Sequence, residues 1–99
     1  MKPTDKSIHG TSYKLTFKVH PADLLDVLGE PHATSGDKTN YEWFLETESG
    51  EVFTVYDWKT PAEHWEHRIP IELNIGAFST EAAEDGLKEI KQAIKEMFK

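Results

Sequence analysis

The sequence predicts an α+β fold, with a mainly antiparallel four-stranded sheet and two helices packed on one of its faces. The segments follow the order strand, helix, strand, strand, strand, helix, without the regular strand–helix alternation of a parallel sheet. The chain has 99 residues, of which 37% are hydrophobic, so it can bury one modest core of two layers. One domain fits this length, and two do not.

The domain is expected to cover residues 11–99, after a flexible leader formed by residues 1–10. The leader is polar and shows no periodicity, with Ile8 as its one large aliphatic side chain. Residues 11–19 then alternate apolar and polar side chains, the two-residue period of a strand with one buried face. The side chains expected on that buried face are Tyr13, Leu15, Phe17 and Val19.

A short helix is predicted for residues 21–28, because Pro21 is tolerated in a first helical turn and leucines recur behind it at helical spacing. Gly29 followed by Pro31 is a typical helix end. Residues 30–40 are rich in turn-forming residues and lack periodicity, so we expect a mobile loop there.

Residues 41–47 and 51–58 are rich in aromatic and β-branched side chains and flank a short turn, which predicts a β-hairpin. We expect a three-residue loop with Gly50 in the left-handed conformation, because a two-residue turn would force Ser49 to a positive φ. One face of the hairpin is then apolar, whereas the other is too polar for a core and too aromatic for an ordinary surface. The apolar face carries Tyr41, Trp43, Leu45, Phe53 and Val55, and the mixed face carries Glu42, Phe44, Glu46, Val52, Thr54, Tyr56 and Trp58.

A fourth strand is predicted for residues 71–76, and a closing helix follows the cap hydroxyls of Ser79 and Thr80. Gly86 is unusual in that helix, because glycine weakens a helix interior by about 1 kcal/mol relative to alanine. Either this glycine is simply tolerated, or it belongs to a flat strip on which another surface, including a second copy of the chain, packs closely.

The charge balance and the absence of cysteine limit the classes of function. Eleven Lys and Arg against eighteen Asp and Glu give a net charge of −7, which argues against electrostatic binding of DNA or of an anionic membrane. The chain has no cysteine, so disulfides and thiol chemistry are excluded. Neither a signal peptide nor a membrane-spanning pattern is present, so we expect a cytoplasmic protein that binds neither DNA nor membrane.

The sequence carries no recognisable catalytic frame, so we expect a protein that is not an enzyme and that holds no cofactor or metal. His64 and His67 are the densest pair of potential metal ligands, and on a helical turn they could share one Zn²⁺. Two ligands do not complete a site, and the His-Glu-x-x-His arrangement is missing. A solvated loop is therefore favoured, and a metal-dependent enzyme using these histidines is the third alternative for function.

Asp57 ends the apolar row of the hairpin, and a carboxylate that faces a core needs a partner. Lys59, Arg68 or a loop amide could be that partner. The functional alternative leaves Lys59 available for an anionic ligand, next to aromatic rings that stack on a base. These rings are Trp43, Tyr56 and Trp58.

Several short motifs resemble landmarks of small proteins of unassigned function that tailed bacteriophages encode. The resemblance covers about residues 28–99. The chain has Leu73-Asn74 where that family has Trp-His, and it has Ala77 in place of a second glycine. The motifs that carry the resemblance are Lys38-Thr39, Glu42-Trp43, Tyr56-Asp57-Trp58-Lys59 and Asn74-Ile75-Gly76.

This resemblance implies a phage accessory protein that acts in the host cytoplasm. Such proteins often counter host defence, so we expect one that binds and sequesters a nucleotide second messenger. In that reading Lys59 contacts phosphate, and the chain is so short that the pocket forms between the subunits of a homo-oligomer such as a dimer. The ligand-binding residues expected are Lys38, Thr39, Trp43, Tyr56, Asp57, Trp58, Lys59 and Asn74.

The alternative function is inhibition of a host protein. The acidic and aromatic hairpin would then be the contact surface for a basic partner, and its carboxylates would steer the encounter. These carboxylates belong to Glu42, Glu46, Glu48 and Glu51.

Overall fold

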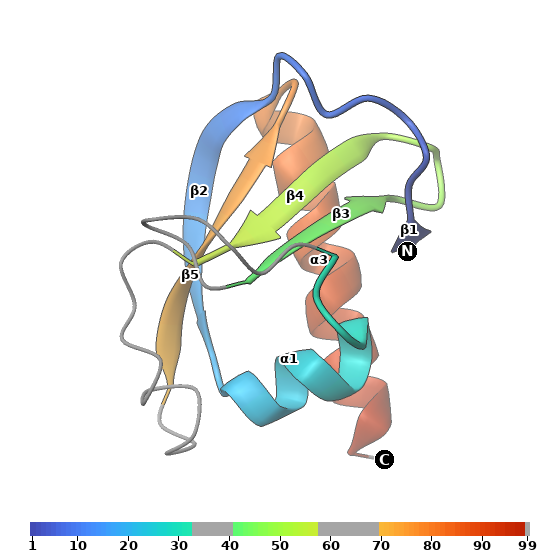
Figure 1. Ribbon diagram of the computed structural model, residues 1–99. Helices are drawn as coiled ribbons and strands as arrows, with labels where there is room; N and C mark the ends of the chain where they lie inside the picture. Colours follow the sequence, from blue (N-terminus) through green and yellow to red (C-terminus); the bar gives the residue numbers. More distant parts are fainter. Residues whose placement is uncertain (33–40, 58–69, 99) are drawn as a thin grey trace.

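The computed structural model describes residues 1–32, 41–57 and 70–98. These residues form a five-stranded sheet of strand order β1-β3-β4-β5-β2, together with two helices (Figure 1). All pairings between the described strands are antiparallel, so the predicted α+β class is confirmed. The elements are β1 (Lys2–Pro3), β2 (Ser12–Val19), α1 (Pro21–Leu28), β3 (Glu42–Glu46), β4 (Val52–Tyr56), β5 (Ile71–Ala77) and α3 (Thr80–Met97).

The number of strands differs from the prediction by one. Lys2 and Pro3 lie within the expected leader, yet they pair with Glu46 and Leu45 as the short strand β1. A strand of two residues is too short to show a periodic pattern in the sequence. It forms because the edge of β3 has free backbone groups with which it can pair.

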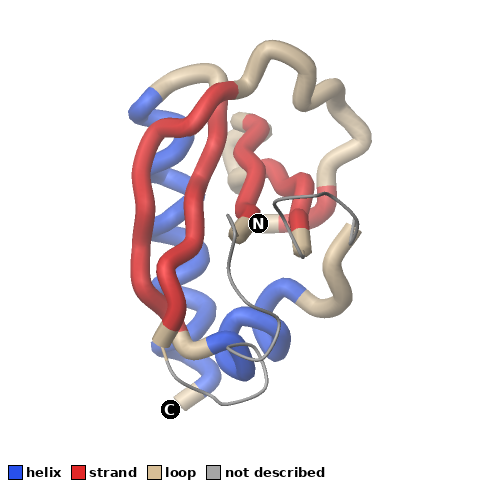
Figure 2. Tube along the Cα trace, turned by 60° about the vertical axis from the view of Figure 1, so that its left-hand side comes forward, coloured by secondary structure: helices blue, strands red, loops and turns tan. Residues whose placement is uncertain are grey.

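Within the part of the chain that the structure describes, both helices lie on one face of the sheet and none covers the other. Figures 1 and 2 show α3 running along one side of the sheet, with α1 beside its C-terminal half. Contacts of α3 with β2, β4 and β5, and of α1 with α3, define this arrangement. Among the side chains completely or almost completely buried in the resulting core are Leu24, Trp43, Leu45, Phe53, Val55, Leu73, Ile75 and Ile90.

The hairpin formed by β3 and β4 has the predicted register. Leu45 lies opposite Phe53 and Trp43 lies opposite Val55. Gly50 takes the left-handed conformation, with φ of 88°, and its N–H donates to the carbonyl of Thr47 at 2.9 Å. The three-residue loop therefore directs the apolar row inward, as the sequence predicts.

One expected core residue, Tyr13, lies on the surface instead. It pairs with Gly76, whereas the next paired residue, Leu15, lies opposite Ile75, so Lys14 is the extra residue of a β-bulge. The bulge moves Tyr13 to the sheet face away from α3 and leaves it 56% exposed. The expectation that residue 13 shares the buried face with the rest of β2 is therefore wrong, because the alternation is interrupted.

Both helices begin as their sequences predict. The N-cap hydroxyl of Ser79 accepts a hydrogen bond from the Ala82 N–H at 3.1 Å, and this bond satisfies one of the free donors of the first turn. Pro21 begins α1, and Gly29 ends it with φ of 75°.

Gly86 is buried where α3 approaches the sheet most closely. A Cβ atom at this position would lie 2.7 Å from the ring of Phe53, closer than van der Waals contact permits. The strip around Gly86 therefore packs on the sheet inside the molecule. The interpretation of this strip as a self-association surface is wrong, because Phe53 already occupies it.

The free edge of β3 is closed by the N-terminal segment and by the chain after α1. The Thr4 N–H donates to the Phe44 carbonyl at 3.1 Å, and the His32 N–H donates to the Glu42 carbonyl at 2.8 Å. The Phe44 N–H donates to Nδ1 of His32 at 2.9 Å. These bonds satisfy backbone groups that an edge strand would otherwise expose.

Glu46 anchors the N-terminal segment to the sheet. Its carboxylate lies 3.4 Å from Nζ of Lys2 and 3.2 Å from Nζ of Lys6, and it accepts a hydrogen bond from the Thr4 hydroxyl at 3.3 Å. The hydrogen bond with Lys6, with a smaller contribution from Lys2, lowers the pKa of the Glu46 carboxyl from its ordinary value of 4.5.

The close contact at Gly86 predicts that Gly86→Ala destabilises the protein. Overpacking typically costs about 1–3 kcal/mol, which exceeds the gain of about 1 kcal/mol from placing alanine in a helix. We expect urea denaturation to give a lower free energy of unfolding for this variant. Glu84→Ala, at an exposed position of α3, should change it by no more than about 0.5 kcal/mol. A more stable Gly86→Ala protein would contradict the contact with Phe53.

The lysine contacts of Glu46 predict a stabilisation that depends on pH. Because the pKa of Glu46 is lowered in the folded state, its contribution is fully present above about pH 4.5 and is lost as the pH falls through the folded value. Wild type should therefore melt at a higher temperature than Glu46→Gln at neutral pH, and the two melting temperatures should converge in acid. Glu51→Gln, on the same hairpin, is the control. A difference that persists unchanged to pH 2 would contradict this assignment.

Candidate functional site

The sheet face that points away from α3 carries the candidate site, and we refer to it as the open face. The register of β3, β4, β5 and β2 aligns its side chains in two neighbouring rows that cross four strands. In strand order, the first row is Phe44, Thr54, Gly76 and Tyr13, and the second row is Glu42, Tyr56, Asn74 and Thr16.

The first row, together with Glu42 and Tyr56 of the second, lines a shallow hollow of about 300 Å³. Thr54 and Gly76 are buried and lie at its centre. Tyr13, Phe44 and Tyr56 contribute aromatic rings around them, and Glu42 contributes a carboxylate. The remaining lining residues are Ile8, Thr11 and Ser12, from the segment that precedes and begins β2.

Gly76 is required for the shape of this hollow. A Cβ atom there would lie 2.8 Å from Oγ1 of Thr54 and 3.4 Å from the carbonyl oxygen of Ser12. A larger residue would therefore push β4 or the start of β2 aside. The missing side chain also leaves open the space between Tyr13 and Thr54.

Tyr56 is half-buried in this setting, and its ionisation is disfavoured. Burial raises the pKa of the Tyr56 phenol above its ordinary value of 10.0, and the nearby Tyr13 and Glu42 raise it further. A phenolate here would be poorly solvated and close to other negative charge. The phenol is therefore neutral at physiological pH.

Only part of the predicted ligand site is formed by described residues. Tyr56 and Asn74 are direct partners across β4 and β5, so the structure brings these two predicted residues together on the open face. The other predicted residues Lys38, Thr39, Trp58 and Lys59 lie outside the described residues, as do His64 and His67.

Trp43 and Asp57 are placed where they do not contact a ligand. Trp43 is fully buried, and its Nε1–H donates to the Gly29 carbonyl at 3.1 Å. Asp57 is also fully buried, and it accepts the Tyr41 N–H at 3.0 Å. Because both side chains are fully buried, the binding roles expected for Trp43 and Asp57 do not fit the structure. A loop amide was one of the partners predicted for Asp57, and the amide of Tyr41 is such a partner.

Sequence reasoning missed Tyr13 and Gly76 as members of the site. The regular alternation of the sequence predicts Tyr13 in the core. The bulge at Lys14 interrupts that alternation, so Tyr13 points to the other face of the sheet. One signal was available: a glycine within a strand often marks a bulge or a close approach of two backbones. Gly76 marks both here, because it pairs with Tyr13 next to the bulge and lies close to the backbone of Ser12.

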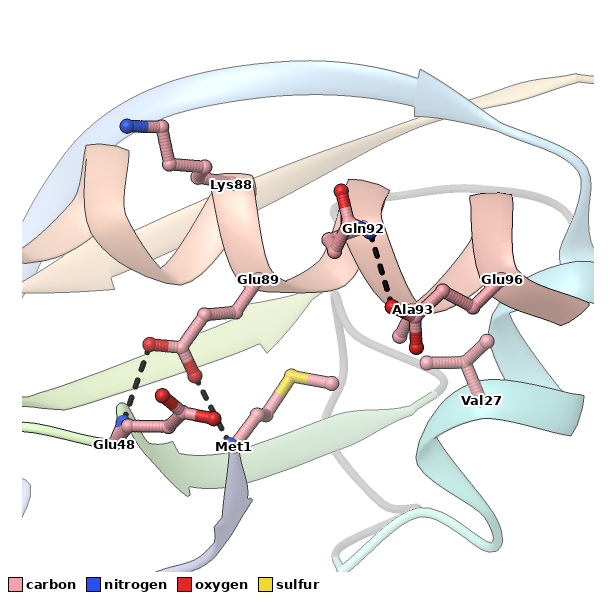
Figure 3. Close-up of a pocket in the computed structure, with 8 residues that line it drawn as sticks. All are labelled: Met1, Val27, Glu48, Lys88, Glu89, Gln92, Ala93 and Glu96. Carbon is pink, nitrogen blue, oxygen red and sulfur yellow. Dashed lines mark hydrogen bonds and ion pairs between the residues drawn. The ribbon is translucent and has the colours of Figure 1, made fainter.

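A larger hollow of about 620 Å³ lies between α1, α3 and the turn of the hairpin (Figure 3). Its central carboxylate, Glu89, lies 3.0 Å from the amino group of Met1 and accepts the Glu48 N–H at 3.1 Å. Gln92 donates to Glu96 at 3.1 Å. Glu89 therefore joins the N-terminal residue and the hairpin turn to α3, so we assign this hollow a structural role.

Within residues 1–32, 41–57 and 70–98, no group of three His, Asp or Glu side chains is arranged to hold a metal ion. In the same part of the chain, neither helix combines the length and apolar character that crossing a membrane requires. Comparison with protein-family models, curated proteins and solved structures found no match to this chain.

The surroundings of Tyr56 predict a measurable titration. Ionisation of tyrosine is followed by its absorbance in wild type and in Tyr56→Phe, and the difference between the two titrations reports Tyr56. We expect this difference to appear above pH 10, because burial and neighbouring charge disfavour the phenolate. Glu42→Gln should lower the pKa of Tyr56 by removing a negative charge. Glu84→Gln, on α3, serves as the control. A Tyr56 component that titrates below pH 10 would contradict the described packing.

Proposed function

We propose that this protein is a non-enzymatic phage accessory protein that binds a host protein with a basic surface through the open face of its sheet. The observation that carries the proposal is the composition of this face. Aromatic rings of Tyr13, Phe44 and Tyr56 lie around a hollow that also contains the carboxylate of Glu42. Tyr13 is exposed, whereas Phe44 and Tyr56 are half-buried. Aromatic side chains at the surface beside polar ones are typical of protein-binding surfaces.

Charge supports a basic partner. The chain carries a net charge of −7, and none of the described residues that line the hollow is Lys, Arg or His. A basic surface would be drawn to the protein over a distance and would then meet aromatic rings at the contact. The phage origin and the host cytoplasm as site of action rest on the resemblance of residues 28–99 alone.

A second candidate function is sequestration of a nucleotide second messenger. The pairing of Tyr56 with Asn74 favours it, because a ring that can stack on a base lies beside an amide that can hydrogen-bond to the base edge. One observation weakens it: Trp43 and Asp57, two of the residues expected to bind the nucleotide, are buried in the core.

Binding through the open face is tested with a charge-reversal variant. Wild type, Glu42→Lys and Glu84→Lys are immobilised and exposed to a bacterial lysate, and retained proteins are quantified by mass spectrometry. We expect wild type and Glu84→Lys to retain the same protein in similar amounts. Glu42→Lys should retain about tenfold less of it, or even less, because charge reversal at a contact costs several kcal/mol. Glu84→Lys is the control, because it changes the net charge by the same amount as Glu42→Lys but lies at an exposed position of α3.

Equal retention by both variants, or no retention by wild type, would overturn the proposal. In parallel, the melting temperature is measured with cyclic di- and trinucleotides. A nucleotide-dependent increase that is lost in Tyr56→Leu would support the second candidate instead. Each folded variant is first checked by circular dichroism, so that a loss of binding is not caused by unfolding.

A further inference from the structure

We propose that the side of β2 that faces away from β5, its outer edge, binds an extended segment of a partner protein. The segment would add to the sheet as a further strand, with acidic side chains alternating with apolar ones. This edge lies at the end of the sheet opposite to β1, and it is a different surface from the hollow on the open face. The inference is therefore independent of the proposed function.

The chain satisfies the two edges of its sheet to different degrees. At one end of the sheet, β1 and the backbone N–H groups of Thr4 and His32 bond to β3. At the other end, β2 pairs with β5. Within residues 1–32, 41–57 and 70–98, no further strand and no backbone hydrogen bond joins the outer edge of β2. An edge of this kind presents N–H and C=O groups with which another extended chain can pair.

The regular part of β2 is long enough to receive such a segment. The bulge at Lys14 interrupts the start of the strand, but the five residues from Leu15 to Val19 pair with β5 without a break. They extend over roughly 17 Å. In an antiparallel pair, every second residue directs its N–H and C=O groups to the partner strand, and the others direct theirs outward. An added segment can therefore form several backbone hydrogen bonds along this stretch.

Apolar side chains lie beside this edge on the helix side of the sheet. Leu15 and Leu87 pack against the core but are only half-buried. Glu89 of α3 reaches toward the hairpin turn, and Leu87, two residues earlier, lies about 200° around the helix from it. Leu87 is thus on the flank of α3 nearer β2, along which the helix runs (Figure 2). Apolar side chains of an added strand would cover these two leucines, which favours binding.

The other face of the edge favours acidic side chains. β2 contains Lys14 and Lys18 and no acidic residue, in a chain of net charge −7. Lys18 is exposed and lies opposite Glu72 of β5, but no ion pair joins these two described side chains. Opposite charges on neighbouring strands stabilise their pairing. A carboxylate on the added strand would therefore be attracted to Lys18.

The same lysines disfavour a second copy of the chain as the occupant. If two β2 strands paired about a two-fold axis at Thr16, Lys14 of each copy would lie near Lys18 of the other. Like charges on neighbouring strands destabilise the pairing. Lysines and bulges on edge strands are common means by which proteins avoid pairing with their own copies. The charge of the edge thus rejects an identical strand and accepts an acidic one.

The test uses the full-length, ¹⁵N-labelled protein and a short acetylated peptide in which glutamate and valine alternate between terminal glycines. One comparison peptide has lysine in place of glutamate. The other has the same composition, with the glutamates and the valines grouped in separate blocks. Dissociation constants and contact sites are measured from amide chemical shifts, and hydrogen exchange of the β2 amides is measured with and without peptide.

We expect the alternating acidic peptide to bind about fivefold or more tightly than either comparison peptide. The largest shifts should fall on residues 15–19. The amides that point outward from this stretch should exchange about tenfold or more slowly in the complex, because they become hydrogen-bonded. Slower exchange at every second residue distinguishes strand addition from simple attraction between charges.

Variants assign the contact to the edge. Lys18→Glu should weaken binding of the alternating acidic peptide about fivefold or more, because it reverses the charge beside the added strand. Lys88→Glu, which changes the net charge equally but lines the hollow beside Glu89, should leave binding unchanged. If Lys18→Glu is unfolded by circular dichroism, Lys18→Gln replaces it and Lys88→Gln becomes its control.

No binding at about 1 mM peptide, equal binding of the three peptides, or shifts outside residues 15–19 would each overturn the inference. Equal weakening by Lys18→Glu and Lys88→Glu would do the same, because it would show attraction to the whole molecule and not to the edge. Shifts at residues 15–19 that depend on protein concentration and not on peptide would identify a second copy as the occupant, against the inference.

Discussion

The ring of Phe53 against the backbone of Gly86 is the contact on which the rest of this structure depends. It sets the distance between α3 and the sheet, because no Cβ atom separates the two. The contact also fixes which hairpin residues face the helix. Successive residues of a strand point to opposite faces, so with Phe53 and Val55 directed inward, Thr54 and Tyr56 must point outward. The composition of the open face is therefore a direct consequence of how the core is packed.

The N-terminal segment and the turn of the hairpin stabilise the edge of this two-layer arrangement. Residues before β2 would be free to move if they were not held by Glu46 and by the edge of β3. Lys2 and Lys6 approach one carboxylate from the same segment, so ordering the segment satisfies both contacts at once. Glu89 joins the hairpin turn to α3 in a similar way, through the Glu48 amide. The acidic side chains of the hairpin are thus divided between structural contacts, as with Glu46, and the open face, where Glu42 lies.

Much of the fold follows from local patterns, and the candidate site follows from them only in part. The hairpin register was predictable because Gly50 relieves the strain of the turn, and the start of α3 was predictable because Ser79 caps it. The pairing of Tyr56 with Asn74 joins two residues that were predicted separately. Trp43 was assigned to a ligand although the same register placed it on the apolar face. Its burial shows that the face of the strand was the better guide than the chemistry of the side chain.

Local patterns in the sequence are enough to predict the α+β class, the hairpin register, the boundaries of the helices to within a few residues and the net negative charge. Each of these depends on neighbouring residues, through periodicity, turn strain, capping or simple composition. Three features become visible only in the folded protein: Lys2–Pro3 form a strand, the ring of Phe53 packs on Gly86, and Tyr13 turns outward beside Gly76. These features depend on contacts between segments distant in the chain. The free energy that settles them comes from packing and pairing across the sheet, which no local pattern records.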